Sequence, residues 1–145
     1  MVCEQRGQIK LDTNDLSGLS YNIKDIVKKN NTSRRMRVVT DVLSLPLMMN
    51  QPDTIYKFLS QLFADVKPHD CVFLSTLEEG VHRQNVLAAM QQLFDGVTEL
   101  RLYEEGLRVV PLLRIRKMRG VPPQPGYYGF SFSKAGMEVT THAIR

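Results

Sequence analysis

Apolar residues recur every three or four positions in three stretches of the chain, and each stretch predicts an amphipathic helix. The first covers about Asp15 to Lys29 and ends at the polar pair Asn30-Asn31. The second covers residues 52–66 and begins at Pro52, whose missing N–H costs nothing in the first turn of a helix. The third extends from about Val86 to Phe94.

Two continuously apolar segments lie between these helices and predict buried strands. Arg37 to Leu43 and CVFLST, residues 71–76, lack the polar alternation of a half-exposed strand, which favours central positions in a parallel sheet. A weaker signal at Ile9 to Leu11 predicts a short strand before the first helix. Because strands that alternate with helices are typical of parallel crossovers, this part of the chain is predicted to be an α/β structure.

The pattern that follows is typical of antiparallel hairpins. Residues 97–117 predict a hairpin that turns at Glu104-Glu105-Gly106, and Pro111 indicates an edge or a bulge in its second strand. Residues 127–140, YYGFSFSKAGMEVT, predict a second hairpin that turns near Lys134-Ala135-Gly136.

The composition is that of an ordinary globular protein. The 145 residues are 43% hydrophobic and 23% charged, and no apolar stretch approaches the roughly 18 residues that a membrane helix needs. We expect one domain over residues 1–145, with an α/β part at 9–96 and an antiparallel β part at 97–140. The opening MVCEQRGQIK shows no apolar signal region, and Cys3 and Cys71 are too few for a disulfide framework. These features predict a cytoplasmic protein in which Cys71 is a buried, reduced thiol.

The net charge is +4, and many of the basic residues gather in two clusters. Both clusters are able to attract the phosphates of nucleotides or of nucleic acid. A solvated basic face that keeps the protein soluble is the alternative interpretation. One cluster is KKNNTSRRMR, residues 28–37, and the other consists of Arg108, Arg114, Arg116, Lys117 and Arg119.

The stretch Arg37 to Asp41 fits the Walker B pattern, in which an apolar strand carries an acid to the carboxyl edge of a sheet. An acid at this place holds Mg²⁺, usually through a water molecule, so Asp41 is a candidate metal and nucleotide ligand. A strand-terminal cap or turn acid is the alternative. The phosphate-loop pattern G-x-x-x-x-G-K-[S/T] occurs nowhere in these 145 residues.

Two further groups of residues are candidates for a site. Glu78 and Glu79 follow CVFLST and form a possible pair of catalytic carboxylates, with Glu78 the stronger candidate; alternatively both acids interact with the dipole of the next helix. Phe130 and Phe132 lie near basic residues and are candidates for stacking on bases. Their alternation along a strand favours the simpler interpretation that both face a core.

The order of these segments resembles the KaiC-like branch of the RecA superfamily, hexameric ATPases that include circadian-clock and archaeal signalling proteins. The resemblance extends over about residues 9 to 140 and implies the C-terminal half of a RecA-like three-layer domain. The segments that carry it are IKLDTNDLSGLSYNIKDIV, RVVTDVLS, CVFLSTLEEG, LFDGVTELRL, LLRIRKMRG and YYGFSFSKAGMEV.

The resemblance also implies roles for individual residues. Asp41 takes the position of the acid that holds Mg²⁺, and Ser75-Thr76 resemble the polar pair of the sensor strand, beside the nucleotide. Lys117 and Arg119 match the family's K-x-R-G stretch, whose basic residues reach the phosphates of ATP on a neighbouring subunit. A solvated strand end is the alternative for these two residues. ATP and Mg²⁺ are thus implied only with a partner subunit, and no cofactor is expected for the isolated chain.

In RecA-like sheets the strand before the phosphate loop lies between the counterparts of CVFLST and VTELRL. Its absence exposes two strand edges and apolar surface. The chain is therefore expected to close the two strands together, to dimerise or to pair with another polypeptide. The alternative is that the chain is a piece of a longer gene. The leading hypothesis is a non-hydrolytic KaiC-like module that acts through self-association or a partner ATPase subunit. A nucleic-acid-binding module of recombinase-like fold and an ATPase with an unrecognised phosphate loop are the alternatives.

Overall fold

The computed structural model describes residues 15–30, 36–41, 43–122 and 125–144. The chain divides into two compact units, Met1–Leu93 and Phe94–Arg145, which are described here separately. The strand expected at Ile9 to Leu11, residues 31–35 of the basic cluster at 28–37 and Cys3 lie outside the described residues.

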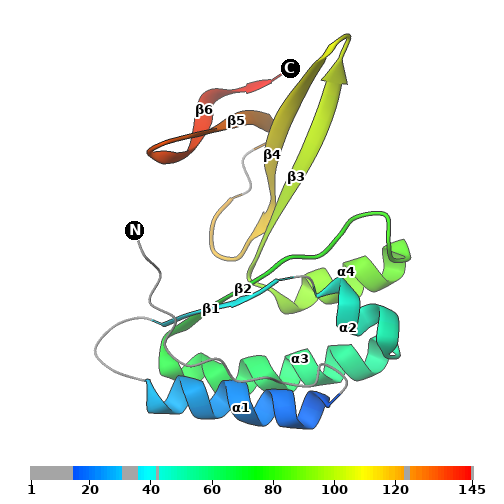
Figure 1. Ribbon diagram of the computed structural model, residues 1–145, viewed down its shortest axis with the longest axis vertical. Coiled ribbons are helices and arrows are strands. Elements are labelled where there is room, and N and C mark those ends of the chain that lie inside the picture. Colours follow the sequence, from blue (N-terminus) through cyan, green and yellow to red (C-terminus); the bar gives the residue numbers. More distant parts are fainter. Residues whose placement is uncertain (1–14, 31–35, 42, 123–124, 145) are drawn as a thin grey trace. The chain divides into compact units, whose positions relative to one another are not determined.

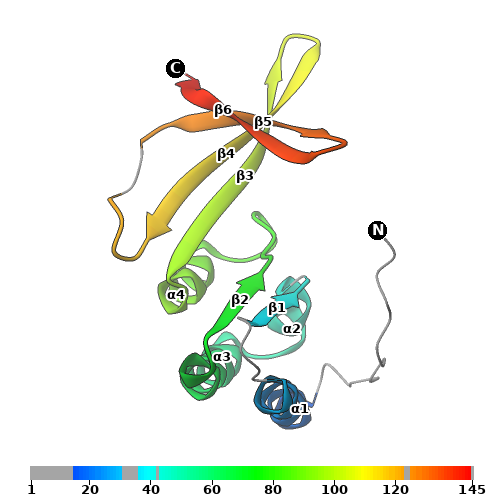
Figure 2. The same ribbon diagram turned by 90° about the vertical axis from the view of Figure 1, so that its left-hand side faces the viewer.

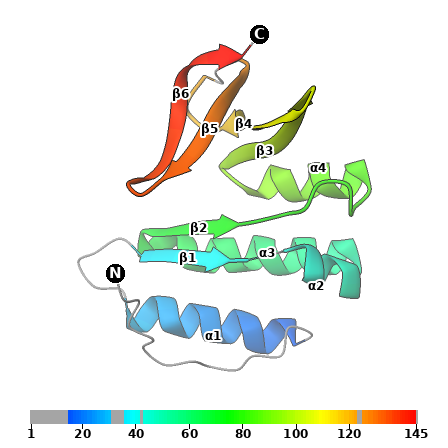
Figure 3. The same cartoon turned by 45° about the horizontal axis from the view of Figure 1, so that its top comes forward.

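The first unit contains a parallel pair of strands covered by helices (Figure 1). Its two strands pair in register from Met36–Cys71 to Thr40–Ser75. Figure 3 shows α1 and α3 side by side along the same face of β1 and β2. The elements in chain order are α1 (Leu16–Lys29), β1 (Met36–Thr40), α2 (Ser44–Met49), α3 (Pro52–Val66), the 3-10 turn η1 (Lys67–His69), β2 (Cys71–Ser75) and α4 (Gln84–Leu93).

α1 and α3 begin and end where the sequence predicts, whereas α4 begins at Gln84, two residues before the expected Val86. Asp15 caps α1 by accepting a 2.9 Å hydrogen bond from the Gly18 N–H, and Asn30 follows as the C-cap. Pro52 occupies the first turn of α3. A small core lies between these helices and the strands, built on Val27, Leu62 and Val66, with Ile23, Met36, Val38, Phe58, Cys71 and Phe73 packed against it.

The first strand is shorter than the sequence predicts. An extended segment was expected from Arg37 to Leu43, but β1 ends at Thr40 and the apolar run continues into the short helix α2. Leu43 and Leu47 are both buried, and a spacing of four residues places two side chains on the same side of a helix. Because a helical turn buries both leucine side chains, the strand ends at Thr40, directly before Asp41.

Among the described residues of the first unit, α1 and α3 cover one face of the β1–β2 pair, and the burial expected for central strands is wrong for the other face. Along both strands, half-buried and exposed residues alternate. The exposed face presents Val39, Val72 and Leu74, with 65%, 47% and 59% of their surface accessible. We call these three residues the bare face. Among the described residues, β2 is paired with β1 alone, which leaves its other edge open.

The second unit is an antiparallel sheet in the order β3-β4-β5-β6, as the sequence predicts. Figure 2 shows the β5–β6 hairpin crossing the direction of β3 and β4, in keeping with a β4–β5 ladder of only two residue pairs. Among the described residues, β2 pairs with β1 and β3 pairs with β4. The strands are β3 (Gly96–Glu105), β4 (Arg108–Met118), β5 (Tyr127–Ser133) and β6 (Gly136–Ile144).

Three details of this sheet differ from the sequence-based expectations. The first hairpin turns at Gly106-Leu107, one or two residues later than predicted. The bulge lies at Arg116, between the pairs Val97–Lys117 and Thr98–Ile115, and not at Pro111, which pairs with Leu102 and lies just beyond the two β4–β5 pairs. Phe132 is 78% exposed and contacts Phe130 edge-on, so the expectation that both rings face a core is wrong for Phe132.

Candidate functional site

Asp41 and Thr76 meet where the two parallel strands end. The Thr76 hydroxyl donates a 3.1 Å hydrogen bond to Oδ1 of Asp41. The backbone fixes this pair, because the Thr76 N–H donates to the carbonyl of Thr40 (3.3 Å) and the Leu43 N–H donates to the carbonyl of Thr76 (2.8 Å). Both side chains are exposed. An accessible carboxylate and hydroxyl therefore lie together at the carboxyl edge of the β1–β2 pair, where α/β sheets bind ligands.

Ser75 does not join this pair. It continues the half-buried side of β2, the side on which Phe73 packs against the core. Its hydroxyl oxygen is buried and has no hydrogen-bond partner within the described part of the chain. Of the two polar residues implied by the resemblance, the structure places Thr76 beside Asp41 and turns Ser75 toward the helices.

Glu78 lies in the loop after β2, with an exposed side chain. Its backbone N–H donates a 3.0 Å hydrogen bond to the hydroxyl of Ser44, which is itself buried at 1% exposure. This contact ties the loop to α2. The interpretation of Glu78 and Glu79 as dipole partners of the next helix is wrong, because α4 begins at Gln84 and has no acid in its first turn.

Lys117 and Arg119 belong to the second unit, near the end of β4. Lys117 is half-buried, and its Cα partner is Val97 beside the bulge. Arg119 is held by Asp95 twice: its Nη1 lies 2.5 Å from the Asp95 carboxylate, and its N–H donates a 2.7 Å hydrogen bond to the Asp95 carbonyl. Both side chains of this ion pair are largely exposed, so Arg119 is oriented yet accessible.

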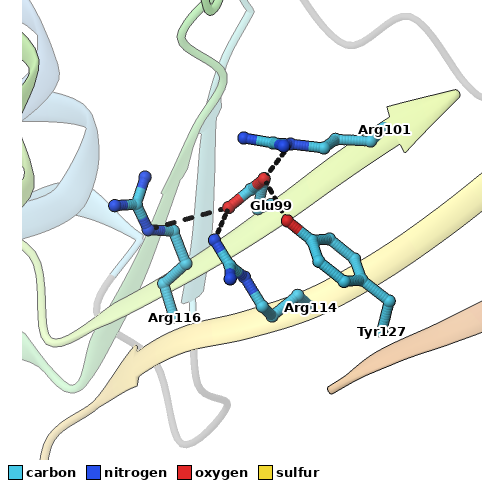
Figure 4. A network of polar contacts seen from close by, with 5 residues as sticks. All are labelled: Glu99, Arg101, Arg114, Arg116 and Tyr127. Carbon is cyan, nitrogen blue, oxygen red and sulfur yellow. Dashed lines mark hydrogen bonds and ion pairs between the residues drawn. The ribbon is translucent and has the colours of Figure 1, made fainter. Parts of the chain in front are cut away.

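A polar network that the sequence analysis missed surrounds Glu99 in β3 (Figure 4). The Glu99 side chain is only 7% exposed. Its carboxylate is contacted by Nη2 of Arg114 at 2.7 Å, by the Tyr127 hydroxyl at 2.9 Å and by Nε of Arg101. Nε of Arg116 lies 3.6 Å away. The guanidinium carbons of Arg114 and Arg101 lie 4.7 and 5.8 Å from the centre of the Tyr127 ring.

The arginines keep Glu99 ionised although it is buried. Burial raises the pKa of the carboxyl, and the hydrogen bonds from Arg114 and Tyr127 with the charges of Arg101 and Arg114 outweigh it, so that the pKa lies below its usual range. Counting six residues away from the turn on each strand, from the pair Glu105–Arg108, gives Glu99 opposite Arg114. The correct turn position would have revealed this pair from the sequence.

Asp41 and Thr76 supply one carboxylate and one hydroxyl, and no group of three or more His, Cys, Asp or Glu side chains in the described ranges is placed to hold a metal ion. A single carboxylate suffices for Mg²⁺ only where phosphates provide further ligands. The phosphate-loop pattern that would position those phosphates is missing from the 145 residues.

Comparison with known families decides what this arrangement is related to. The family model described as "ATPase: KaiC" matches residues 2–144. The chain belongs to the KaiC ATPase family. No curated protein matches it in sequence.

Among solved structures, the fold of this KaiC-family chain is similar to that of a KaiC-like protein from the hyperthermophilic archaeon Pyrococcus horikoshii OT3. The TM-score is 0.67 at 23% sequence identity. The match covers 87% of this chain and 57% of that one, so the chain spans little more than half the length of its structural relative. The mixed fold expected from the sequence, parallel strands with helices followed by antiparallel strands, is confirmed. No helix among the described residues is long and apolar enough to cross a membrane.

Proposed function

We propose that this chain is a KaiC-family module that does not hydrolyse ATP by itself and acts through association, either with a second copy or with a complete ATPase subunit. The observation that carries the proposal is the bare face of Val39, Val72 and Leu74 beside the open edge of β2. An unpaired strand edge with an apolar face is a template for another polypeptide.

The position of Asp41 supports a role for this association in nucleotide binding. Asp41 and Thr76 lie at the carboxyl ends of β1 and β2, next to the open edge. A partner that adds a strand and a phosphate-binding loop at this edge would bring its phosphates toward the single carboxylate that the chain supplies. Without such a loop, the isolated chain has no means of holding a triphosphate there.

Lys117 and Arg119 are proposed to act on a nucleotide bound to another subunit. Arg119 is held near Asp95 and remains accessible, which suits a guanidinium that has to reach an external phosphate. Donors of this kind stabilise charge that develops on phosphoryl oxygens. In an assembly with a complete KaiC-family ATPase, Arg119→Ala is expected to lower the rate of ATP hydrolysis while leaving assembly intact.

The test combines oligomeric state with nucleotide binding. Light scattering after gel filtration is expected to show self-association, or a complex once a complete KaiC-family ATPase subunit is added. The double variant Val72→Lys/Leu74→Lys is expected to abolish either assembly, because charges on the bare face cannot be buried unpaired. Leu107→Lys, at the fully exposed hairpin tip, is the matched control and is expected to assemble like the unmodified chain.

Two results would contradict the proposal. One is a chain that stays monomeric and binds no ATPase subunit. The other is tight, Mg²⁺-dependent binding of an ATP analogue to the isolated monomer that Asp41→Asn abolishes, since the monomer would then hold a complete nucleotide site.

A further inference from the structure

Asp95 and Arg119 close the open end of the β3–β4 hairpin. Asp95 directly precedes Gly96, the first residue of β3, and Arg119 directly follows Met118, the last residue of β4. Gly96 and Met118 are cross-strand partners. The Arg119 N–H donates a 2.7 Å hydrogen bond to the Asp95 carbonyl, which extends the ladder by one step. The backbones of Asp95 and Arg119 are therefore held together independently of their side chains.

A tight turn fixes the backbone of Arg119 from its other side. The Val121 N–H donates a 3.3 Å hydrogen bond to the Met118 carbonyl, so residues 118–121 form a β-turn with Arg119 as its second residue. Gly120, the third residue, has a φ of 77°, the value that a type II turn requires at this position and that glycine adopts without strain. The Arg119 side chain therefore leaves the hairpin from a defined backbone conformation.

The side chains add an ion pair to this backbone frame. Nη1 of Arg119 lies 2.5 Å from Oδ1 of Asp95. The two side chains are 61% and 71% exposed, and an ion pair this exposed contributes little to stability. It does act on orientation, because an arginine side chain has many rotamers and a carboxylate on a fixed backbone favours those few that reach it.

A single carboxylate leaves part of the Arg119 guanidinium group for a ligand. A guanidinium group has five N–H donors in a planar fork, and a carboxylate meets that fork along one edge. The other edge can then donate to phosphate oxygens while Asp95 keeps its contact. Because both side chains are exposed, a phosphate from outside the second unit can approach that edge.

We propose that Asp95 is a positioning residue for Arg119, which it holds ready for the phosphates of a nucleotide bound to another subunit. This inference rests on the proposed function, because it supports the role given there to Arg119. Asp95 itself contacts no phosphate. It reduces the side-chain freedom that Arg119 would otherwise lose on reaching the phosphoryl group, so less of the contact energy is spent on orientation.

The first test uses the full chain and needs no partner. The heteronuclear NOE of the Arg119 Nε–Hε group, measured by NMR, is expected to have the high value of an ordered side chain and to fall in Asp95→Ala. Glu104→Ala removes the same charge near the other end of β3 and is expected to leave the NOE unchanged. An Arg119 side chain that is equally mobile in the unmodified chain and in Asp95→Ala would overturn the proposal.

The second test measures ATP hydrolysis by the assembly with a complete KaiC-family ATPase. Asp95→Ala is expected to lower kcat about threefold to fivefold, the range that one exposed ion pair can supply, and to leave KM for ATP unchanged. The loss is expected to vanish when Arg119 is already alanine, since Asp95 acts only through that residue. Asp95→Glu keeps the carboxylate and is expected to retain most of the rate, and Glu104→Ala all of it.

The outcomes separate this inference from the proposed function. An unchanged or raised kcat in Asp95→Ala, or an equal loss with and without the Arg119 side chain, would overturn the inference and leave the role of Arg119 standing. If Arg119→Ala alone left hydrolysis unchanged, the proposed role of Arg119 would fail, and the positioning role of Asp95 with it.

Discussion

Thr76 donates a 3.1 Å hydrogen bond to Asp41, although the two residues lie 35 positions apart in the chain. The contact joins the carboxyl ends of β1 and β2, and both of its side chains are exposed. It places the acid singled out by the Walker B pattern at an accessible edge of the β1–β2 pair.

Asp41→Asn is expected to separate stability from function at this edge. Asp41 is exposed, so urea denaturation should show a change in unfolding free energy within about 0.5 kcal/mol. Mg²⁺ and ATP are expected to strengthen the complex that the unmodified chain forms with a complete KaiC-family ATPase. In Asp41→Asn this strengthening is expected to be lost. Glu104→Gln, an exposed acid elsewhere, serves as the control. Equal Mg²⁺ dependence in both variants would exclude Asp41 as a metal ligand.

Leu62→Ala is expected to destabilise the first unit strongly. Leu62 is fully buried in α3 and packs with Val27 and Val66, so its truncation should cost about 2–5 kcal/mol through lost burial and a remaining cavity. Urea denaturation followed by circular dichroism measures the loss. Leu107→Ala makes the same change at an exposed position and should stay within about 0.5 kcal/mol. A small loss in Leu62→Ala would show that the core lies elsewhere.

Gly106→Ala tests the turn that sets the register of β3 and β4. Gly106 has a φ of 61°, in the left-handed region, and no atom lies within 4 Å of an added Cβ. The substitution should therefore cost about 1 kcal/mol through backbone conformation alone. Leu107→Ala, the other residue of the two-residue turn, should cost less because its φ is not positive. Equal melting temperatures for the two variants would contradict this account.

Stability is expected to fall in acid through Glu99. Its folded-state pKa is lowered, so the carboxylate contributes stability above its unfolded value of about 4.5, and that stability is lost as the pH falls through the folded pKa. Between about pH 6 and about pH 3, unfolding free energies should decrease more for the unmodified chain than for Glu99→Gln. Glu104→Gln should follow the unmodified chain. If the unfolding free energies of all three proteins fell equally with pH, the acid sensitivity would arise from groups other than Glu99.

Local signals were sufficient for most of the helices and hairpins. Asp15 and Pro52 predicted the beginnings of α1 and α3 correctly, because capping and the proline ring act within one turn. The end of β1 was predicted wrongly. Leu43 looks like the continuation of a strand, and only the burial of Leu43 with Leu47 reveals the helical turn.

The sequence named Asp41 and Thr76 as candidates, and the structure brings these two residues into contact, whereas the Glu99 network was not foreseen from the sequence. The hairpin was predicted, but its turn was placed at Glu104-Glu105-Gly106 instead of Gly106-Leu107. A shift of one or two residues changes every cross-strand partner and hides the pairing of Glu99 with Arg114.

The sequence by itself determined the kinds of elements, their order, the family and the candidate acid Asp41, because periodicity, capping and short motifs depend on neighbours in the chain. Tertiary structure alone decided that Val39, Val72 and Leu74 stay exposed, that Ser75 turns inward while Thr76 meets Asp41, and that three arginines converge on Glu99. These features depend on which strands pair and in what register, and contacts between distant residues fix both.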